Sequence, residues 1–341
     1  MPRSLVFALA LALSMLSFAI PAFACGGLIG PNGAVNLLRT TTFVGYHDGV
    51  EHYVTAFQFA GGGGKFGSLT PLPGVPSNVE KGGSWTLQRL IRETQPIKSF
   101  GPVAFADAGS ARSTVEVLLQ TKIDALDITV LKGGGAAVGE WATAHGFRLP
   151  ADAPEVLDFY ANRSPIFLAA AFDADAAAAR GQGIGDGTPV HITIPTANPW
   201  VPLRILALGK QGNDPVTADV YLLTDRKPAI LPLARGANGL ALAYDQPAAK
   251  PLLDDLRSDA GMGWIPASGW LSQLRIDTNA SALTYDLAVD VQGHSPSRVA
   301  AGLETPGSTD PAPIALTMLA AAMAALILVA IREQKRIAVP A

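Results

Sequence analysis

The sequence predicts an α+β fold: a mixed, largely antiparallel sheet or sheets with several packed helices, plus one C-terminal transmembrane helix. Strand-like segments rich in β-branched and aromatic residues are interspersed with short helical patterns, but without the regular alternation of βαβ units. No fixed-period repeat is visible. An uncharged apolar run near the C-terminus predicts the transmembrane helix.

The clearest element is a β-hairpin within residues 40–60. Two β-rich runs flank Asp48-Gly49, which is a favoured two-residue hairpin turn. Side chains alternate between the two faces of a strand, so pairing across this turn sorts the residues into two sets. One face is expected to carry Val44, Tyr46, Tyr53 and Phe57, and the other His47, Val50 and His52.

The remaining elements are predicted from the periodicity of apolar residues and from glycine and proline residues that interrupt the pattern. Ser84 is expected to cap a helix, Gly146 to end one, and Pro154 to begin one. The expected helices are 84–94, 136–146, 153–163 and 248–259. The expected strands are 114–123, 126–133, 165–172, 189–195, 201–209, 218–225 and 281–291, with a short extended segment at 66–76.

The N-terminus has the pattern of a secretory signal peptide over residues 1–24. A basic start precedes the apolar run 5–20, and the small-residue motif Ala-Phe-Ala at 22–24 follows. The alternative is a first transmembrane helix, which the short run and its helix-breaking end disfavour. The sequence therefore predicts an exported chain with an extracytoplasmic domain over 25–293 and a candidate lobe boundary near 173–187.

The C-terminus predicts a membrane anchor. Residues 314–331 carry no charge, and about 18 residues at 1.5 Å each approach the thickness of a bilayer. A Pro/Ser/Thr-rich spacer (294–313) precedes them and a basic tail (332–341) follows, which the positive-inside rule places in the cytoplasm. A buried core helix, a sortase signal and a GPI signal are the alternatives. The expected topology is a single pass with the main domain outside the cytoplasm.

The order of several motifs carries a family resemblance. An "ACGG" start is followed by the Asp-Gly hairpin, "PLPGVP", "LDITVLKGGGAAVGEWATAHG", "FLAAAF", "TPVHITIP" and "DVYLLTD". Over residues 25–230 this order resembles the bacterial domain-of-unknown-function family numbered 2330. The resemblance implies an exported or surface bacterial protein, often membrane-anchored, without an established activity. It transfers no catalytic or binding residues.

Composition excludes several function classes. The chain of 341 residues has a formal net charge of −3 and no basic stripe, which argues against a nucleic-acid partner. Its glycine runs lack the spacing of phosphate-binding loops, so no cofactor is expected. One cysteine excludes an intramolecular disulfide.

That cysteine, Cys25, is one candidate for chemistry. Cleavage after Ala24 would leave it as the first mature residue, where it could be an ordinary residue, a lipidated one or a nucleophile. The hairpin histidines His47 and His52 are candidate metal ligands, although two histidines near a turn are more often solvated.

Two functions are consistent with these features. We expect a binding module at the bacterial cell surface, with the membrane and a cell-envelope or protein partner, because the sequence shows no clustered catalytic set. The alternative is a thiol-dependent hydrolase or transferase that uses Cys25.

Overall fold

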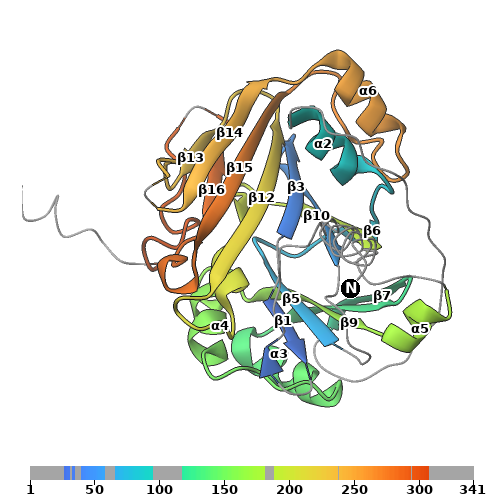
Figure 1. The fold of residues 1–341 in the computed structure, drawn as a ribbon, viewed down its shortest axis with the longest axis vertical. Coiled ribbons are helices and arrows are strands. Elements are labelled where there is room, and N and C mark those ends of the chain that lie inside the picture. The colour runs from blue at the N-terminus through green and yellow to red at the C-terminus, as the bar shows by residue number, and fades with distance from the viewer. Residues whose placement is uncertain are drawn as a thin grey trace, which may run out of the picture. The chain divides into compact units, whose positions relative to one another are not determined.

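The computed structural model describes residues 27–30, 33–34, 40–57, 66–94, 117–180, 188–236, 238–292 and 294–306. These residues form three sheets of seven, six and three strands (Figure 1). The predicted α+β class is wrong, because the described structure is mostly β. The described α-helices are only 5 to 11 residues long, and they cover the sheets without forming a layer of comparable size.

The seven-stranded sheet is the largest layer. All its neighbouring strands are antiparallel except β12 and β3, which run parallel. In spatial order the strands are β14 (Leu240–Pro247), β15 (Trp270–Asn279), β12 (Pro215–Thr224), β3 (Thr40–His47), β4 (Val50–Phe57), β10 (Thr188–Pro195) and β6 (Asn78–Lys81).

The two smaller sheets are wholly antiparallel. The six-stranded sheet consists, in spatial order, of β2 (Gly33–Ala34), β1 (Gly27–Gly30), β5 (Phe66–Leu72), β9 (Ile166–Phe172), β8 (Leu126–Lys132) and β7 (Val117–Ile123). The three-stranded sheet consists of β11 (Trp200–Val201), β16 (Leu287–Asp290) and β13 (Ala229–Leu231).

Helices cover the sheets in two groups. Helices α2 (Thr86–Thr94) and α6 (Lys250–Ser258) pack on each other and share a core cluster with the seven-stranded sheet. Helix α3 (Gly134–Ala144) packs on β8, β9 and α4 (Ala153–Ala161). The remaining helical segments are α5 (Ala174–Ala178) and the 3-10 turns η1 (Arg204–Ala207) and η2 (Ala280–Ala282).

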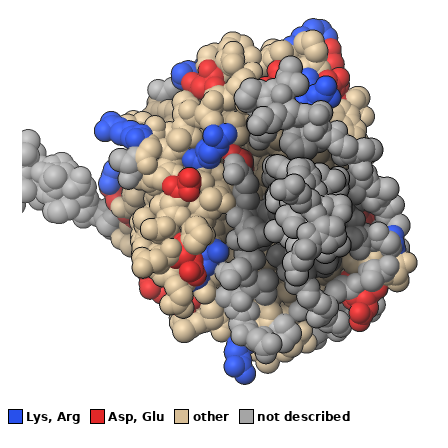
Figure 2. Space-filling view, in the orientation of Figure 1, with Lys and Arg blue, Asp and Glu red and all other residues tan. Residues whose placement is uncertain are grey.

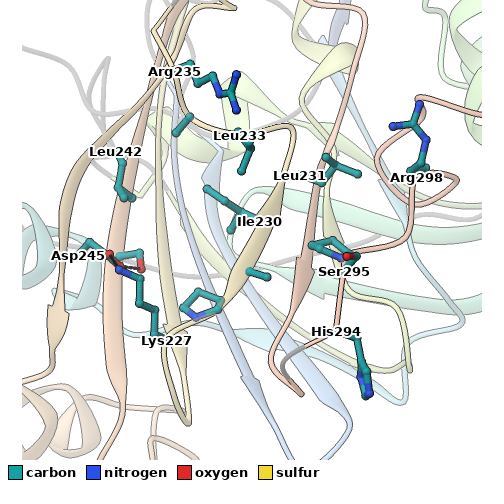
Figure 3. Close-up of a pocket in the computed structure, with 15 residues that line it drawn as sticks. Lys227, Ile230, Leu231, Leu233, Arg235, Leu242, Asp245, His294, Ser295 and Arg298 are labelled. Carbon is teal, nitrogen blue, oxygen red and sulfur yellow. Dashed lines mark hydrogen bonds and ion pairs between the residues drawn. The ribbon is translucent and has the colours of Figure 1, made fainter.

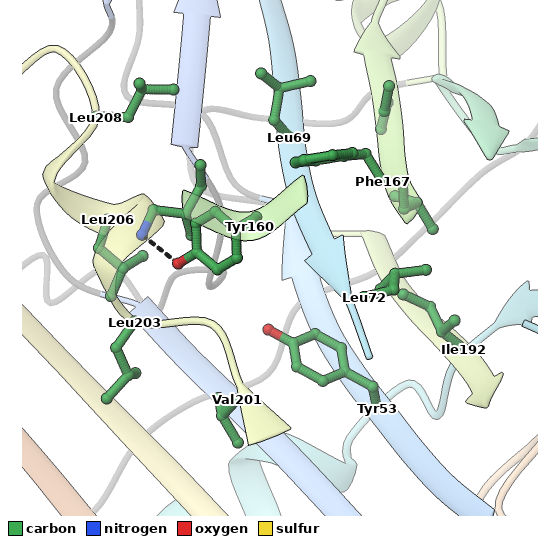
Figure 4. Close-up of a cluster of buried hydrophobic side chains, with 14 of the residues drawn as sticks. Tyr53, Leu69, Leu72, Tyr160, Phe167, Ile192, Val201, Leu203, Leu206 and Leu208 are labelled. Atoms are coloured by element: carbon green, nitrogen blue, oxygen red, sulfur yellow. Dashed lines mark hydrogen bonds between the residues drawn. The ribbon is translucent and has the colours of Figure 1, made fainter. Parts of the chain in front are cut away.

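Two apolar clusters form the core. The larger one joins residues of all three sheets with α3 and α4, and the smaller lies between the seven-stranded sheet and helices α2 and α6. Figure 4 shows part of the larger cluster, in which Tyr53, Leu69, Phe167 and Ile192 come from different strands. The two clusters cover opposite faces of the seven-stranded sheet, and their burial is the main stabilising term of the fold.

The predicted hairpin is confirmed. Strands β3 and β4 pair from Thr42 with Thr55 to His47 with Val50. Asp48 and Gly49 both have positive φ, 49° and 77°, as the tight turn requires. The register also separates the two predicted sets of side chains, since Val44 lies opposite Tyr53 while Gly45 lies opposite His52.

Other segments depart from the sequence prediction. The expected strand 201–209 is wrong beyond Val201, which ends β11, because η1 begins at Arg204. The expected strand 281–291 shortens to β16, preceded by η2. Strands β14 and β15 were not expected, although β15 pairs along its full length with β12.

Helix α2 receives its N-terminal cap from a distant residue. The carboxylate of Asp259 accepts the backbone N–H groups of Ser84, Trp85 and Thr86 at 2.9–3.0 Å, together with the Thr86 hydroxyl at 2.8 Å. A side chain at Gly83 would meet Asp259 at 2.4 Å, so glycine there permits the approach. The predicted cap Ser84 instead donates its N–H, and the negative charge of Asp259 complements the helix N-terminus.

The chain divides into two units, Met1–Leu303 and Glu304–Ala341, and every described sheet belongs to the first. Among the described residues no helix is long and apolar enough to cross a bilayer. The predicted transmembrane helix at 314–331 lies outside the described residues, as does the signal peptide 1–24. The predicted domain limits stay predictions.

Candidate functional site

The structure gives His47 and His52, the two metal-ligand candidates, different partners. His47 lies at the end of β3, where its Nδ1 is 2.6 Å from Asp225 Oδ1 and its Nε2 is 3.2 Å from Asp48 Oδ2. Donor atoms of these three residues lie within 4.8 Å of one another, but the residues are exposed or half-exposed. This acidic surface cluster does not include His52.

His52 pairs instead with a histidine 139 residues away. Its Nδ1 lies 2.9 Å from Nε2 of His191 on β10, and His191 Nδ1 lies 3.1 Å from Glu80 Oε1 on β6. The carboxylate of Glu80 favours a proton on Nδ1 of His191, which leaves Nε2 as the acceptor toward His52. A chain of hydrogen bonds therefore crosses three neighbouring strands.

Trp264 covers this histidine pair. Its ring stacks on His52 at 4.0 Å with an interplanar angle of 2°, and its centroid is 5.6 Å from that of His191. A Cβ atom at Gly45, opposite His52, would lie 2.3 Å from the Trp264 ring, so the glycine provides the space for the indole.

The environment keeps both rings neutral. Burial, followed by the positive charges that His191 and His47 would carry, lowers the pKa of His52 to about 4. Burial also lowers the pKa of His191, although Glu80 opposes this. Neutral, stacked and mutually bonded rings at neutral pH are the properties of a packed core polar pair.

Cys25, the remaining candidate, lies outside the described residues.

A second feature is an open groove at one side of the first unit, with a volume of about 740 Å³. It is lined by residues of the segment 227–235, by Leu242 and Asp245 of β14, by Ser272 of β15 and by residues of 294–298. The lining includes Leu242 of β14 and Ile230 and Leu231 of β13, and Figure 3 shows the last two extending to opposite sides of their strand. The apolar interior between the seven-stranded and the three-stranded sheet thus continues outward into this groove.

Basic side chains surround the groove. Lys227, Arg235 and Arg298 line it with His294, against one acidic residue, Asp245. Figure 2 shows Lys and Arg side chains along the left margin, where Figure 1 places β13 and β14. This local excess of positive charge contrasts with the net charge of −3 of the whole chain.

The charge of Asp245 is compensated within the fold. Its carboxylate accepts hydrogen bonds from Trp270 Nε1 at 2.6 Å and Ser272 Oγ at 2.9 Å, and it pairs with Lys227 Nζ at 2.5 Å. Burial would raise the pKa of Asp245, but these hydrogen bonds hold it below its ordinary value. Within the part of the chain that the structure describes, Arg235 makes no ion pair.

Comparison with known proteins places the chain in a family. A family model described as "Uncharacterized protein conserved in bacteria (DUF2330)" matches residues 20–286. The chain belongs to this bacterial family. The resemblance predicted from the serial order of motifs is therefore confirmed, and it extends through the groove strands β13, β14 and β15. A search of curated proteins finds no match.

Solved structures give only remote similarity. The crystal structure of baculovirus P35 has a TM-score of 0.38 and 9% identity, covering 74% of this chain and 96% of that chain. A mutated baculovirus P35 after caspase cleavage also has a TM-score of 0.38, with 8% identity over 75% of this chain and 98% of that one. The caspase-8/P35 complex has a TM-score of 0.35, with 8% identity over 74% and 95% of the two chains. TM-scores this low do not establish a common fold.

Sequence reasoning missed the groove because its residues come from separate segments between 227 and 298. No motif joins them. The available signal was the run Leu-Ala-Leu-Ala at 240–243, an apolar segment directly after a glycine-rich turn, which becomes the exposed strand β14. His191 was likewise missed as the partner of His52, since only sheet pairing brings β10 beside β4.

Proposed function

We propose that this protein is an extracytoplasmic binding module that holds a ligand in the groove between β13, β14 and residues 294–298. The observation that carries the proposal is an apolar floor with a basic rim at the side of the fold. Leu233 and Leu242 are 51% and 43% exposed there. Covering such side chains is favourable by about 25 cal/mol for each Å² removed from water.

The polar groups of the groove support binding over catalysis. Ser272 donates its hydroxyl to Asp245, and Asp245 is in turn neutralised by Lys227. His294 Nδ1 lies 3.9 Å from Asp290 Oδ2, on the rim. A ligand with an apolar body and a negative charge would bury the leucines and pair with Arg235, which matches the chemistry present.

We further propose that the module works at the bacterial cell surface. The signal-peptide pattern at 1–24 and the apolar segment 314–331 support export and retention at the membrane, with residues 332–341 inside. The groove would then face the cell envelope.

The topology has a direct test. A cysteine introduced at Ala341 in a Cys25→Ser background should not react with a membrane-impermeant maleimide in intact cells, and should react after permeabilisation. A cysteine at the exposed Val75 serves as the outside control, and it should react in both cases. Labelling of position 341 in intact cells would contradict the proposed orientation.

The groove is tested by site-specific photo-crosslinking of the full chain in bacterial cells. A benzoylphenylalanine at position 242 should give a discrete adduct, because it faces the groove. The matched control is position 118, since Leu118 is also an exposed leucine (37%) on a terminal strand, β7. Replacing Leu233 by aspartate should reduce the adduct at 242. Equal labelling at 118 and 242, or no effect of the Leu233 change, would contradict a groove-specific function.

A further inference from the structure

The two walls of the groove are both sheet edges. Strand β14 is the terminal strand of the seven-stranded sheet, and β13 is the terminal strand of the three-stranded sheet. Within the described ranges each pairs on one side only, β14 with β15 and β13 with β16. The groove is therefore the open side between two sheets, where backbone donors and acceptors of β14 are available to another strand.

Over residues 241–243, strand β14 carries little of the usual protection of an exposed edge. Natural edge strands commonly carry lysine, inward-pointing charges or proline to prevent pairing with other chains. Residues 241–243 are instead Ala-Leu-Ala, and all three are exposed. The protecting features of β14 are a register shift at Ala243 and a proline, Pro247, as its last residue. The one charged residue of β14, Asp245, is already paired with Lys227.

We propose that the groove accepts an extended segment of a partner protein, which pairs with β14 as an added strand. This inference rests on the proposed function and specifies its ligand. Alternate side chains of the segment point into the groove and pack on Leu242, Ile230 and Leu233, as in other complexes formed by strand addition. An acidic residue of the segment pairs with Arg235.

The charges and the backbone favour this occupant over two others. A second copy pairing through β14 in antiparallel fashion would bring two basic rims together, which like-charge repulsion opposes. An acyl chain would cover the leucines but would leave the backbone groups of the β14 edge without partners. A peptide with an acidic residue and alternating apolar residues would complement the basic rim and would also pair with the backbone groups of the β14 edge.

The test begins with a random peptide library displayed on phage. The library is selected on the purified full chain in lipid nanodiscs and counter-selected on the Leu242→Glu variant. The enriched sequences should alternate apolar and polar residues over about eight positions, the length of β14, and carry an acidic residue. Their binding should survive in the Leu118→Glu variant, the matched change on the terminal strand β7.

Two modified forms of an enriched peptide then separate the contributions. N-methylation of alternate amides on its pairing edge should weaken binding at least about tenfold, because it removes backbone pairing while the side chains remain. Replacing its acidic residue by lysine should weaken binding to the natural chain and strengthen binding to Arg235→Glu. This reversal of preference tests the charge pairing without depending on the stability of either variant.

The possible results are distinguishable. Equal binding of the N-methylated peptide would overturn strand addition while leaving the groove as a binding site. No peptide surviving counter-selection, together with an adduct at position 242 that proves to be a lipid or a second copy of the chain, would overturn the partner class but retain the proposed function. No peptide and no adduct at 242 would refute both.

Discussion

Replacing Asp286 by alanine is expected to lower the free energy of unfolding by about 3–5 kcal/mol, because it leaves a buried guanidinium without its counter-ion. Asp286 is fully buried, and the Arg163 side chain is 4% exposed. Arg163 Nη2 forms an ion pair with Asp286 Oδ2, while Nη1 donates to the carbonyl of Ala300 at 2.7 Å.

The same carboxylate organises a turn. Its Oδ1 accepts the backbone N–H groups of Leu203 at 2.7 Å and Arg204 at 3.0 Å, and the Tyr160 hydroxyl at 2.9 Å. Burial, and then the charge of Asp286, raises the pKa of Tyr160 well above its ordinary value, so this hydroxyl stays a donor. The Tyr160 oxygen accepts in turn from the N–H of Ile205 at 2.8 Å, a bond visible in Figure 4.

Urea unfolding of the full chain in nanodiscs measures the effect. The control is Asp255→Ala, which removes an exposed partner of Arg89 and should cost less than about 1 kcal/mol. Asp286→Asn keeps one acceptor oxygen for the turn and should give an intermediate loss. Similar stabilities for the Asp286→Ala and Asp255→Ala variants would show that the buried pair does not stabilise the fold as argued.

Replacing Glu51 by glutamine is expected to have the opposite sign and to stabilise the protein near pH 7 by about 3 kcal/mol. Glu51 lies on β4, opposite Tyr46 on β3, and is fully buried. No described group makes a hydrogen bond of ordinary geometry with either carboxylate oxygen. Burial raises the pKa of Glu51 from 4.5 to about 8, opposed in part by the backbone of Trp200.

The sign follows from proton linkage. In the unfolded chain Glu51 loses its proton near pH 4.5, whereas in the fold it keeps the proton up to about pH 8. The neutral form is therefore favoured by folding, and the stability associated with it is present below pH 4.5 and is lost as the pH rises toward 8. Glutamine is neutral at every pH, so the variant does not lose this stability.

The test is to measure the free energy of unfolding of the natural protein and of the Glu51→Gln variant from pH 4.5 to 8. His52, with its pKa lowered to about 4, acts in the other direction: its contribution is present above about pH 6.5 and is lost as the pH falls toward 4. His52 is common to both chains, so the difference between them isolates Glu51. A difference that stays constant across this range would contradict ionisation of a buried Glu51 as the cause.

The fold class shows where sequence reasoning reached its limit. Strand β15 lies inside the seven-stranded sheet, yet its sequence includes Ser272, Gln273 and Asp277 and does not alternate cleanly. The buried Gln273 donates from its side-chain amide nitrogen to Asp219 Oδ1 on the neighbouring strand β12 at 3.1 Å, while its Oε1 has no hydrogen-bond partner among the described residues. A buried polar residue whose donor finds its partner 54 positions away has no local signature, so the amount of sheet was underestimated.

In the candidate site too, local sequence predicted the position of one residue but not the partners that distant segments supply. The hairpin placed His52 on the face opposite Tyr53, and the register confirms this. Its partner His191 is brought beside it by the pairing of β10 with β4, and Trp264 by the loop that follows α6. The groove likewise requires the terminal strands β13 and β14 of two different sheets to line one hollow, which only the packing of the sheets provides.

The sequence by itself determined the elements that depend on neighbouring residues, and it determined family membership. The Asp48-Gly49 turn, the strands around 117–132 and the helix that begins beside Pro154 arise from turn chemistry, alternation and backbone restriction. Only the tertiary structure decided the mostly β class, the His52–His191 pair, the buried Asp286 and the groove. These features join residues separated by tens to more than a hundred positions, and their energies come from burial and pairing that exist only once the sheets have packed.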